Sequence, residues 1–435
     1  MNIHFISLGC SKNRVDSEFI MGMLTSSNHT LISNPAQAQA IFINTCGFIE
    51  LAKQEAIDTI LQMAEIKEKN NTKLIVLGCL SQRYQQQLTK EMPEVDRFVM
   101  LDEYVILDKI LSNELDIQVQ APYKSTPRIH STQAHIGYLK ISEGCSNNCS
   151  FCAIPLIRGK YHSYPIEELI EQAKIMAKQG VKELVLVAQD TTMYGLDIYK
   201  KSALGDLVEK LNTIDGLLWI RVLYMYPDLL TDELIEKLAS IEKFVPYFDI
   251  PIQHSEDEIL THMKRRGDKQ QIVTRIAKIR DTFTESIIRS TLIVGYPTET
   301  DEHFKQLLQF ISEQKFDKLG AFTFSKEEDT VAYDLVDMDD EIKIKRYTKL
   351  MEAQSKVAQH AQLRFKNQRM TLLVDKVDTI TKTAKCRSPF HAPDDIDGYV
   401  YVPITQEVVV GEKLYCEIEQ IIGYNWYGKV LEYPS

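Results

Sequence analysis

Positive charge and cysteine are both scarce in this chain of 435 residues. Lysine and arginine together number 50, against 61 aspartates and glutamates, which gives a formal net charge of −11. An acidic chain is a poor partner for phosphate backbones, so direct binding of nucleic acid is not expected. Eight cysteines are too few for a disulfide framework, and in a reducing compartment clustered cysteines indicate a metal site or catalysis.

Long apolar runs, a signal sequence and low-complexity linkers are missing as well. No apolar stretch reaches membrane-spanning length. The opening residues, MNIHFISLGC, lack the basic start of a signal peptide, so we expect a cytoplasmic protein without membrane contact. The remaining composition, 44% hydrophobic and 26% charged, is ordinary for a globular protein and is long enough for two or three domains of roughly 150 residues.

Strand-like and helix-like runs alternate over residues 1–117, which predicts a parallel α/β domain. The strand-like runs occupy residues 3–10, 40–48 and 73–80, with helical patterns at 14–27 and 50–69. Each strand-like run gives way to a loop at a cysteine, namely Cys10, Cys46 or Cys79. Parallel sheets bind ligands beyond the carboxyl ends of their strands. We therefore expect these three thiols to converge on one edge of one sheet.

Residues 118–135 are polar, contain two prolines and have no periodicity, which predicts a linker. Alternation resumes over residues 136–366. The strand-like runs there are 138–142, 183–188, 219–225, 247–252, 287–295 and 318–324. The segments between them have helical patterns, and Pro165 and Gly180 are start and stop signals for the first helix. The pattern predicts a partial (β/α)6 barrel with its active site at the carboxyl ends of the strands.

The helical patterns stop in the last part of the chain, residues 367–435. Short strand-like runs separated by turn residues, at 370–377, 397–403 and 413–433, predict a small β-barrel. The predicted fold class is therefore α/β, with an N-terminal parallel α/β domain, a central partial barrel and a C-terminal β-barrel.

A second group of three cysteines, Cys145, Cys149 and Cys152, lies in the stretch EGCSNNCSFC. This loop follows the first strand of the predicted barrel and so lies on its active face. A structural zinc needs four ligands, and the stretch contains no histidine. A 4Fe–4S cube held by three cysteines instead leaves one iron open to bind another molecule. Zinc or a redox pair is the alternative.

The C-x3-C-x2-C spacing, with Phe151 before its last cysteine, resembles the radical S-adenosylmethionine (SAM) enzymes. The resemblance extends over nearly the whole chain to one family among them, the methylthiotransferases, and the C-terminal module resembles their TRAM domain. The stretches that resemble this family are SLGCSKNRVDSE, INTCGFIELAKQEAIDTI, LGCLSQRY, YLKISEGCSNNCSFCAIPLIRGKYHSYP, IPIQHSEDEILTHMKRR and STLIVGYPTETDEHF.

This resemblance implies two 4Fe–4S clusters and SAM as cofactors, with an external electron donor. The cluster at Cys145, Cys149 and Cys152 would bind and cleave SAM. The cluster at Cys10, Cys46 and Cys79 would supply or carry the sulfur. Buried core thiols are the alternative for the second set, since free cysteine is often buried. Cys386 and Cys416 have no such context and are expected to be structural.

Four further residues are predicted to contact the cofactor, namely Phe151, Gln189, Gly295 and Pro297. Gly295 and Pro297 follow a strand, and glycine there would let the backbone approach a ligand closely. An ordinary turn is the alternative. Gln189 and its neighbour Asp190 end a buried strand and could contact SAM or the substrate, or cap the next helix. His254, in IPIQHS, is expected to be a satisfied polar group.

The family includes enzymes that act on a modified adenosine in transfer RNA and enzymes that act on a ribosomal protein. VAQDTTMYGLD and SPFHAPDDIDGYVYV resemble the second branch. Residues 371–435 carry 10 acidic against 6 basic side chains, a net charge of −4, which suits a basic protein rather than RNA. The implied reaction adds a methylthio group to the β-carbon of an aspartate in protein twelve of the small ribosomal subunit.

Two other functions stay open at this point. One is methylthiolation of transfer RNA adenosine, and the other is a non-catalytic iron–sulfur carrier. The chain also departs from the family at Tyr164, where an arginine is common. This change removes a cation near the mouth of the cluster site and leaves the ligands untouched.

Overall fold

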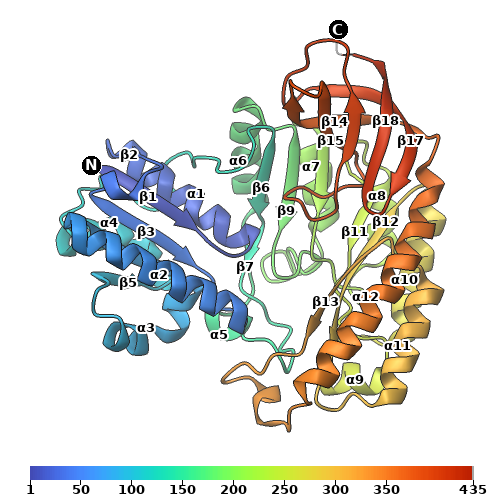
Figure 1. The fold of residues 1–435 in the computed structure, drawn as a ribbon, viewed down its shortest axis with the longest axis horizontal. Coiled ribbons are helices and arrows are strands. Elements are labelled where there is room, and N and C mark those ends of the chain that lie inside the picture. The colour runs from blue at the N-terminus through green and yellow to red at the C-terminus, as the bar shows by residue number, and fades with distance from the viewer. Residues whose placement is uncertain (434–435) are drawn as a thin grey trace.

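The computed structural model describes residues 1–433 and folds them into three units in chain order (Figure 1). Pro434 and Ser435, the end of the predicted module 367–435, lie outside the described residues. In Figure 1 the N-terminal domain lies at the left, and the C-terminal barrel sits on one end of the central barrel. None of the helices in residues 1–433 has the length and apolar character needed to span a membrane.

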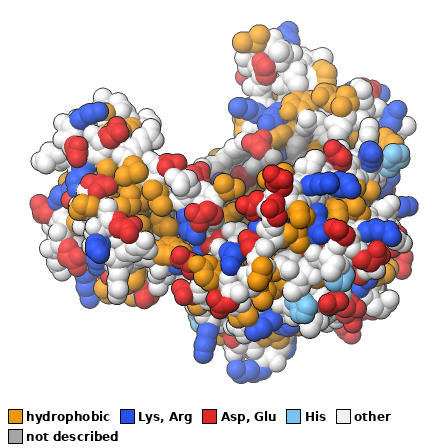
Figure 2. Space-filling view, turned by 60° about the horizontal axis from the view of Figure 1, so that its bottom comes forward, with side chains coloured by type: hydrophobic (Ala, Val, Ile, Leu, Met, Phe, Trp, Pro, Cys, Tyr) orange, Lys and Arg blue, Asp and Glu red, His pale blue; other side chains and the backbone are white. Residues whose placement is uncertain are grey.

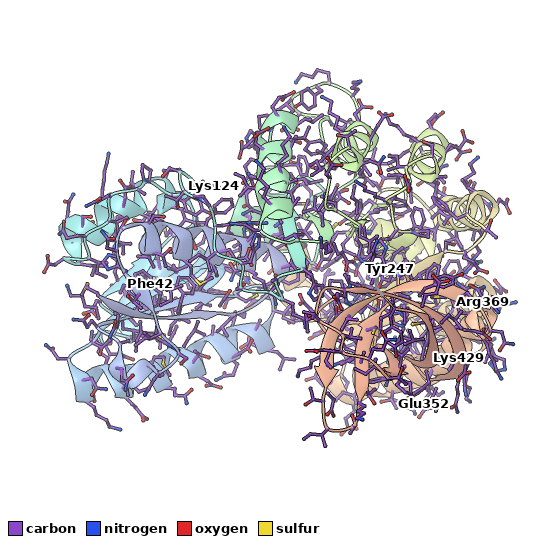
Figure 3. The ribbon with its side chains drawn as sticks, turned by 90° about the horizontal axis from the view of Figure 1, so that it is seen from above. Phe42, Lys124, Tyr247, Glu352, Arg369 and Lys429 are labelled. Carbon is purple, nitrogen blue, oxygen red and sulfur yellow. The ribbon has the colours of Figure 1, made fainter. Side chains whose placement is uncertain are left out.

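A parallel sheet with strand order β2-β1-β3-β4-β5 forms the N-terminal domain. Its strands are β1 (Asn2–Ser7), β2 (Thr30–Leu31), β3 (Ala40–Thr45), β4 (Lys73–Gly78) and β5 (Arg97–Val99). Every residue of the central strand β3 is buried, as expected for a strand covered on both faces. Phe42 of this strand lies inside the domain in Figure 3.

Helices cover both faces of this sheet. They are α1 (Ser11–Ser26), α2 (Glu50–Asn70), α3 (Cys79–Glu91) and α4 (Leu107–Glu114), with short 3-10 turns at Pro35–Gln37 and Asp102–Ile106. Phe42 faces α1 and α4, whereas its neighbours Ile41 and Ile43 face α2 and α3, so the strand period of two supplies two separate cores. Residues 115–135, which include the predicted linker, contain no helix or strand.

The central barrel consists of two parallel three-stranded sheets, β6-β9-β10 and β11-β12-β13, joined by a bridge between Ile220 and Phe244. Its strands are β6 (Ile136–Lys140), β9 (Glu183–Val187), β10 (Trp219–Val222), β11 (Tyr247–Asp249), β12 (Ile287–Val294) and β13 (Lys318–Thr323). A small hairpin of β7 (Ser142–Glu143) and β8 (His162–Ser163) follows β6. All six predicted strands are thus present.

The helices of the central unit are α5 (Ile154–Arg158), α6 (Ile166–Lys178), α7 (Leu204–Asn212), α8 (Asp232–Ala239), α9 (Asp257–His262), α10 (Lys269–Thr282), α11 (Asp301–Gln314) and α12 (Asp340–Gln362), with 3-10 turns at Val331–Asp334 and Leu363–Phe365. Helix α6 begins after Pro165 and is followed by Gly180 with a φ of +103°, as the start and stop signals predict. The short helices α5 and α9 were not predicted.

The last unit is a closed barrel with strand order β14-β15-β16-β18-β17. Its strands are β14 (Arg369–Asp378), β15 (Thr383–Arg387), β16 (Val400–Pro403), β17 (Lys413–Ile422) and β18 (Asn425–Glu432). Arg369 and Lys429 mark its outer surface in Figure 3. With this barrel in place, the predicted fold class is confirmed.

One hydrophobic core runs through all three units. It joins Phe19 of α1 with Tyr138 and Trp219 of the central barrel and with the fully buried Trp426 of β18. A polar layer lies beside it, where Glu183 accepts a hydrogen bond from Arg221 Nε at 2.7 Å and pairs with Arg387 of the C-terminal barrel. The units are therefore packed against one another and are not strung on flexible linkers.

A candidate site between two cysteine triplets

The N-terminal triplet lies on three neighbouring turns at one edge of the sheet. Cys10 precedes α1, Cys46 follows β3, and Cys79 is the first residue of α3. Gly9, with a φ of +86°, packs so closely that a Cβ there would stand 2.8 Å from Cys46 Cβ. A Cβ on Gly47 would stand 3.0 Å from the carbonyl carbon of Cys79. The expected convergence is present, although Cys79 opens a helix and not a loop.

The three N-terminal thiols differ in their electrostatic surroundings. Burial, and then the thiol of Cys79, raise the pKa of Cys46 to about 12. Burial also raises the pKa of the Cys79 thiol. The protein atoms around Cys10 oppose its ionisation, but the positive charges of Lys12 and Arg158, together with the backbone N–H groups of Asn13 and Lys12, outweigh this effect and hold the pKa of Cys10 below its ordinary value. Cys10 is also the solvent-exposed member of the set, which gives the triplet one accessible, ionisable thiol.

The second triplet lies on the loop between β7 and α5, at the carboxyl end of β6. The loop is fixed at both ends, since the Cys145 N–H donates to the Gly159 carbonyl at 3.1 Å and the Ser150 N–H donates to the Met263 carbonyl at 2.9 Å. Burial raises the pKa of Cys145 to about 11 and that of Cys152 to about 12. Buried thiols of this kind become thiolates only with a compensating positive charge, which bound iron would supply.

Each triplet is accompanied by a buried arginine. Arg265 Nη1 lies 3.7 Å from Cys149 Sγ. Arg158 Nη2 lies 3.3 Å from Cys79 Sγ and also donates to Asn13 Oδ1 at 3.1 Å. A guanidinium beside a thiol stabilises the thiolate form, which is the metal ligand.

The donor set of each triplet fits an iron–sulfur cluster. In residues 1–433 no three His, Cys, Asp or Glu side chains are grouped compactly enough to hold a single metal ion. Each triplet offers only free cysteine thiols as donors, and cysteine thiolates are the usual ligands of iron–sulfur clusters.

Helix α5 places the two triplets side by side. It begins two residues after Cys152, and Ala153 and Ile157 pack directly against Cys79. Arg158, at its end, donates from Nη1 to Asp16 at 3.1 Å and to Glu143 at 2.9 Å. In Figure 2, which brings the bottom of Figure 1 forward, the N-terminal domain is the lobe at the left, and a notch in the outline lies between it and the larger remainder of the molecule. The segment that follows one triplet thus forms part of the wall of the other.

The predicted cofactor contacts are spread around the mouth of the central barrel. Phe151 is half-buried and packs beside Tyr296 in an apolar cluster. Gln189 follows β9, and both atoms of its amide are buried without a hydrogen-bond partner in the described residues. The side of Gly295 where a Cβ would stand is covered by the Lys343 stem at 2.5 Å, and Pro297 is half-buried nearby. These four contacts stay predictions.

The two polar neighbours of these residues have protein partners. Asp190 accepts from Asn147 Nδ2 at 2.9 Å, and burial raises the pKa of its carboxyl. His254 is fully buried, and its Nε2 lies 3.5 Å from Glu299. Its Nδ1 accepts the Glu256 N–H at 3.1 Å, but its Nε2 is buried without a hydrogen-bond partner in residues 1–433, so the expected satisfied histidine is only half met.

Several residues at this site were not predicted from the sequence. Arg158 and Arg265 lie in stretches that resemble the family, but only the folded chain brings them to the cysteines. Lys12 reaches the central barrel, and Tyr224 and Gln253 hold left-handed backbone, with φ of +60° and +71°, just beyond β10 and β11. Backbone of this kind in residues other than glycine clusters at functional sites.

Comparison with known proteins gives the family. A family model described as "Uncharacterized protein family UPF0004" matches residues 2–100, and the Radical SAM superfamily matches residues 139–311. The chain is 43% identical over 442 aligned positions to "Ribosomal protein uS12 methylthiotransferase RimO" of Clostridioides difficile (strain 630), covering 99% of both chains. The protein of the same name from Aquifex aeolicus (strain VF5) is 42% identical, with 99% of this chain and 98% of that protein covered.

The chain belongs to the RimO family. The resemblance to radical-SAM methylthiotransferases is thereby confirmed, and with it the interpretation as an enzyme. Solved structures support the fold. A Kitasatospora setae radical S-adenosylmethionine methyltransferase, TsrM, with cobalamin and a [4Fe-4S] cluster bound, is 10% identical with a TM-score of 0.58, covering 76% of this chain and 77% of that one. Iron–sulfur chemistry and SAM are the attributes of the superfamily to which this RimO-family chain belongs.

Proposed function

We propose that this chain adds a methylthio group to the β-carbon of an aspartate in ribosomal protein uS12. Support comes from the relatives named as uS12 methylthiotransferases, which match over the full length. The acidic C-terminal barrel suits a basic protein partner. A ribosomal substrate also implies a cytoplasmic enzyme.

The main structural support for this reaction is the position of α5, which follows one triplet in the chain and packs against Cys79 of the other. Cys145, Cys149 and Cys152 would hold one [4Fe–4S] cluster, and Cys10, Cys46 and Cys79 would hold a second. When bound, these groups and SAM supply the radical that activates an unreactive carbon and the sulfur that is attached to it. Packing of α5 against Cys79 keeps the two sets of thiols close, so that a substrate carbon activated at one is within reach of the other.

The protein's own part is to bind, orient and shield. Anchoring of the Cys145–Cys152 loop at both ends holds the three thiols at the strand ends, where they would bind the first cluster. The N-terminal domain lies over the same face, which limits access of water to a reactive site. We further propose a separate reduced electron-donor protein and no direct contact with nucleic acid.

Mass spectrometry of uS12 tests this function. We expect uS12 from cells that contain the gene to be heavier by one methylthio group than uS12 from a deletion strain, and restoration of the gene to restore the mass. Loss of a modified adenosine from transfer RNA on deletion, with uS12 unchanged, would contradict the proposal and favour the transfer RNA alternative.

A further inference from the structure

The side chain of Lys12 reaches from the N-terminal domain to the mouth of the central barrel. Lys12 follows Cys10 by two residues, at the end of α1 that faces β6 and β7 (Figure 1). Its Nζ lies 3.4 Å from the Ala188 carbonyl oxygen and 3.8 Å from the centre of the Tyr224 ring. Ala188 directly follows β9 and Tyr224 lies two residues beyond β10, and Lys12 is only 8% exposed. A buried positive charge thus lies between the two cysteine triplets.

This charge has no carboxylate partner, unlike the other buried cations beside it. Lys140 and Arg158 both pair with Asp16 and Glu143. Lys12 forms no ion pair with any carboxylate of residues 1–433, and its one hydrogen bond is long. An ammonium carries three donors, and a buried unpaired charge is costly. Apart from its electrostatic interaction with the Cys10 thiol, Lys12 therefore retains hydrogen-bond donors free to bind an anion.

The nearby carboxylate of Asp249 does not meet this need. Its Oδ1 pairs with Arg289 Nη1 at 3.0 Å, and its Oδ2 accepts the Tyr224 N–H at 3.1 Å. Both oxygens are thus engaged away from Lys12.

A second unpartnered group lies one position along the chain from the carbonyl that Lys12 contacts. Gln189 directly follows Ala188, whose carbonyl Lys12 contacts, and both of its amide atoms are buried without a partner in the described residues. A buried amide without partners costs free energy, so a ligand that accepts a hydrogen bond is favoured here. An ammonium and an amide N–H at the same strand end are complementary to a carboxylate, which accepts several hydrogen bonds and carries the opposite charge.

We propose that Lys12 and Gln189 bind the side-chain carboxylate of the aspartate that is modified. This assignment rests on the proposed function. The β-carbon of an aspartate is bonded to that carboxylate, so holding the carboxylate here holds the reacting carbon between the two triplets. Gln189, predicted from the sequence as a contact to SAM or substrate, is thereby assigned to the substrate. The site would select aspartate over its neutral isostere asparagine.

The proposal is tested by comparing the affinities of the holoenzyme for two forms of uS12. The probes are fluorescently labelled uS12 and a variant with asparagine at the modified position. Wild-type enzyme is expected to bind the aspartate form at least about tenfold more tightly, as for a desolvated charge pair. Lys12→Met should bring the ratio of the two affinities, aspartate form over asparagine form, close to one. Lys12→Arg should restore most of this ratio.

Controls separate this role from a structural one. Lys174→Met, a substitution of a half-exposed lysine on α6, should leave the ratio at the wild-type value. Iron content and the electron paramagnetic resonance signals of both clusters verify assembly of each variant. Gln189→Leu, which does not alter the N-terminal domain, should lower affinity for the aspartate form several-fold more than for the asparagine form. It serves where Lys12→Met fails to assemble.

The opposite outcomes are equally defined. A wild-type ratio in both Lys12→Met and Gln189→Leu would overturn the assignment. So would a shifted reduction potential of the N-terminal cluster in Lys12→Met with the ratio unchanged, because the lysine would then only balance the charge of that cluster. If wild-type enzyme neither binds nor modifies uS12, the proposed function itself is wrong, which is a distinct result.

Discussion

At the scale of single residues, the cysteines of this chain were foreseeable and their partners were not. Cys145, Cys149 and Cys152 lie close together in the sequence, so their spacing is visible there. The pattern of a strand followed by a cysteine predicted that the other three cysteines lie at one edge of a sheet. Arg158 and Cys79 are 79 positions apart, and Lys12 and Ala188 are 176 apart. No local pattern encodes such pairs, because they exist only once separate elements have packed.

A single thiol distinguishes the two triplets. Cys79→Ala is expected to remove iron from the N-terminal triplet and abolish methylthiolation, while 5′-deoxyadenosine still forms from SAM at Cys145, Cys149 and Cys152. A thiol-to-methyl change at a helix start should cost about 1–2 kcal/mol, so the protein should fold. The measurements are iron per chain and both products from one reconstituted sample.

The matched control for this change is Cys416→Ala. Cys416 is equally free and fully buried, but it lies in the C-terminal barrel, so full iron content and full activity are expected. Normal product yield from Cys79→Ala would show that the N-terminal thiols do not handle the sulfur. Loss of both products would show that contact of Cys79 with α5 couples the two triplets.

At the scale of elements, those with a full apolar pattern and clear turn signals were predicted, whereas α3 and the short helix α5 were not. The strand β3 and the helix α6 carry complete apolar patterns bounded by turn signals, and both were predicted. Helix α5 has five residues, too few to show a period, and α3 begins directly at Cys79, where a loop was expected. The positive φ of Gly78, +101°, turns the chain from β4 straight into α3.

Substitution of Arg158, at the end of α5, tests whether this helix links the N-terminal domain to the central barrel. Arg158→Met is expected to lower the free energy of unfolding by about 3–5 kcal/mol, because Asp16 and Glu143 lose a buried partner. It should also loosen the N-terminal domain, seen as faster proteolysis within residues 115–135. Arg369→Met, at a largely exposed side chain, should change stability by no more than about 1 kcal/mol. Equal unfolding midpoints and cleavage rates for the two variants would refute a linking role for α5.

At the scale of the whole molecule, the division into units was foreseeable but their union was not. The C-terminal barrel was predicted as a module with its own role in substrate choice. In the structure, the segment SPFHAPDDIDGYVYV, which resembles the ribosomal-protein branch of the family, packs on the central barrel. Its Asp397 accepts a hydrogen bond from Tyr247 at 2.6 Å, and its Ala392 is buried. Tyr247 lies at this junction in Figure 3. Composition reports the charge of a module and not which of its residues face another module.

The junction should respond to acid. Burial alone would raise the pKa of Glu183, but Arg387 and Arg221 hold it below its ordinary value. Burial likewise opposes ionisation of Asp375, and His135 and Arg387 lower its pKa. Carboxyls with pKa values lower in the folded than in the unfolded chain stabilise the fold above the unfolded values, about 4. That stability is lost as pH falls through the folded values.

The expected result is a stability gap that depends on pH. Glu183→Gln, which mimics the protonated carboxyl, should be about 3–5 kcal/mol less stable than wild type at pH 7. The gap should narrow as the pH falls below about 4. Urea unfolding midpoints of both proteins between pH 3 and pH 7 provide the measurement. A gap of constant size over this range would mean that the charge of Glu183 is not what joins the barrels.

The burial of Trp426 in the common core has a consequence for synthesis. The ribosome makes the N-terminal domain and the central barrel first, and domains begin to fold as they emerge. Tyr138 and Trp219 must nonetheless wait for β18, which is made after both, before their core is closed. A message cut short before β18 would therefore yield a chain with this core open to chaperones and proteases. The shared core of the enzyme can therefore close only after β18 has been translated.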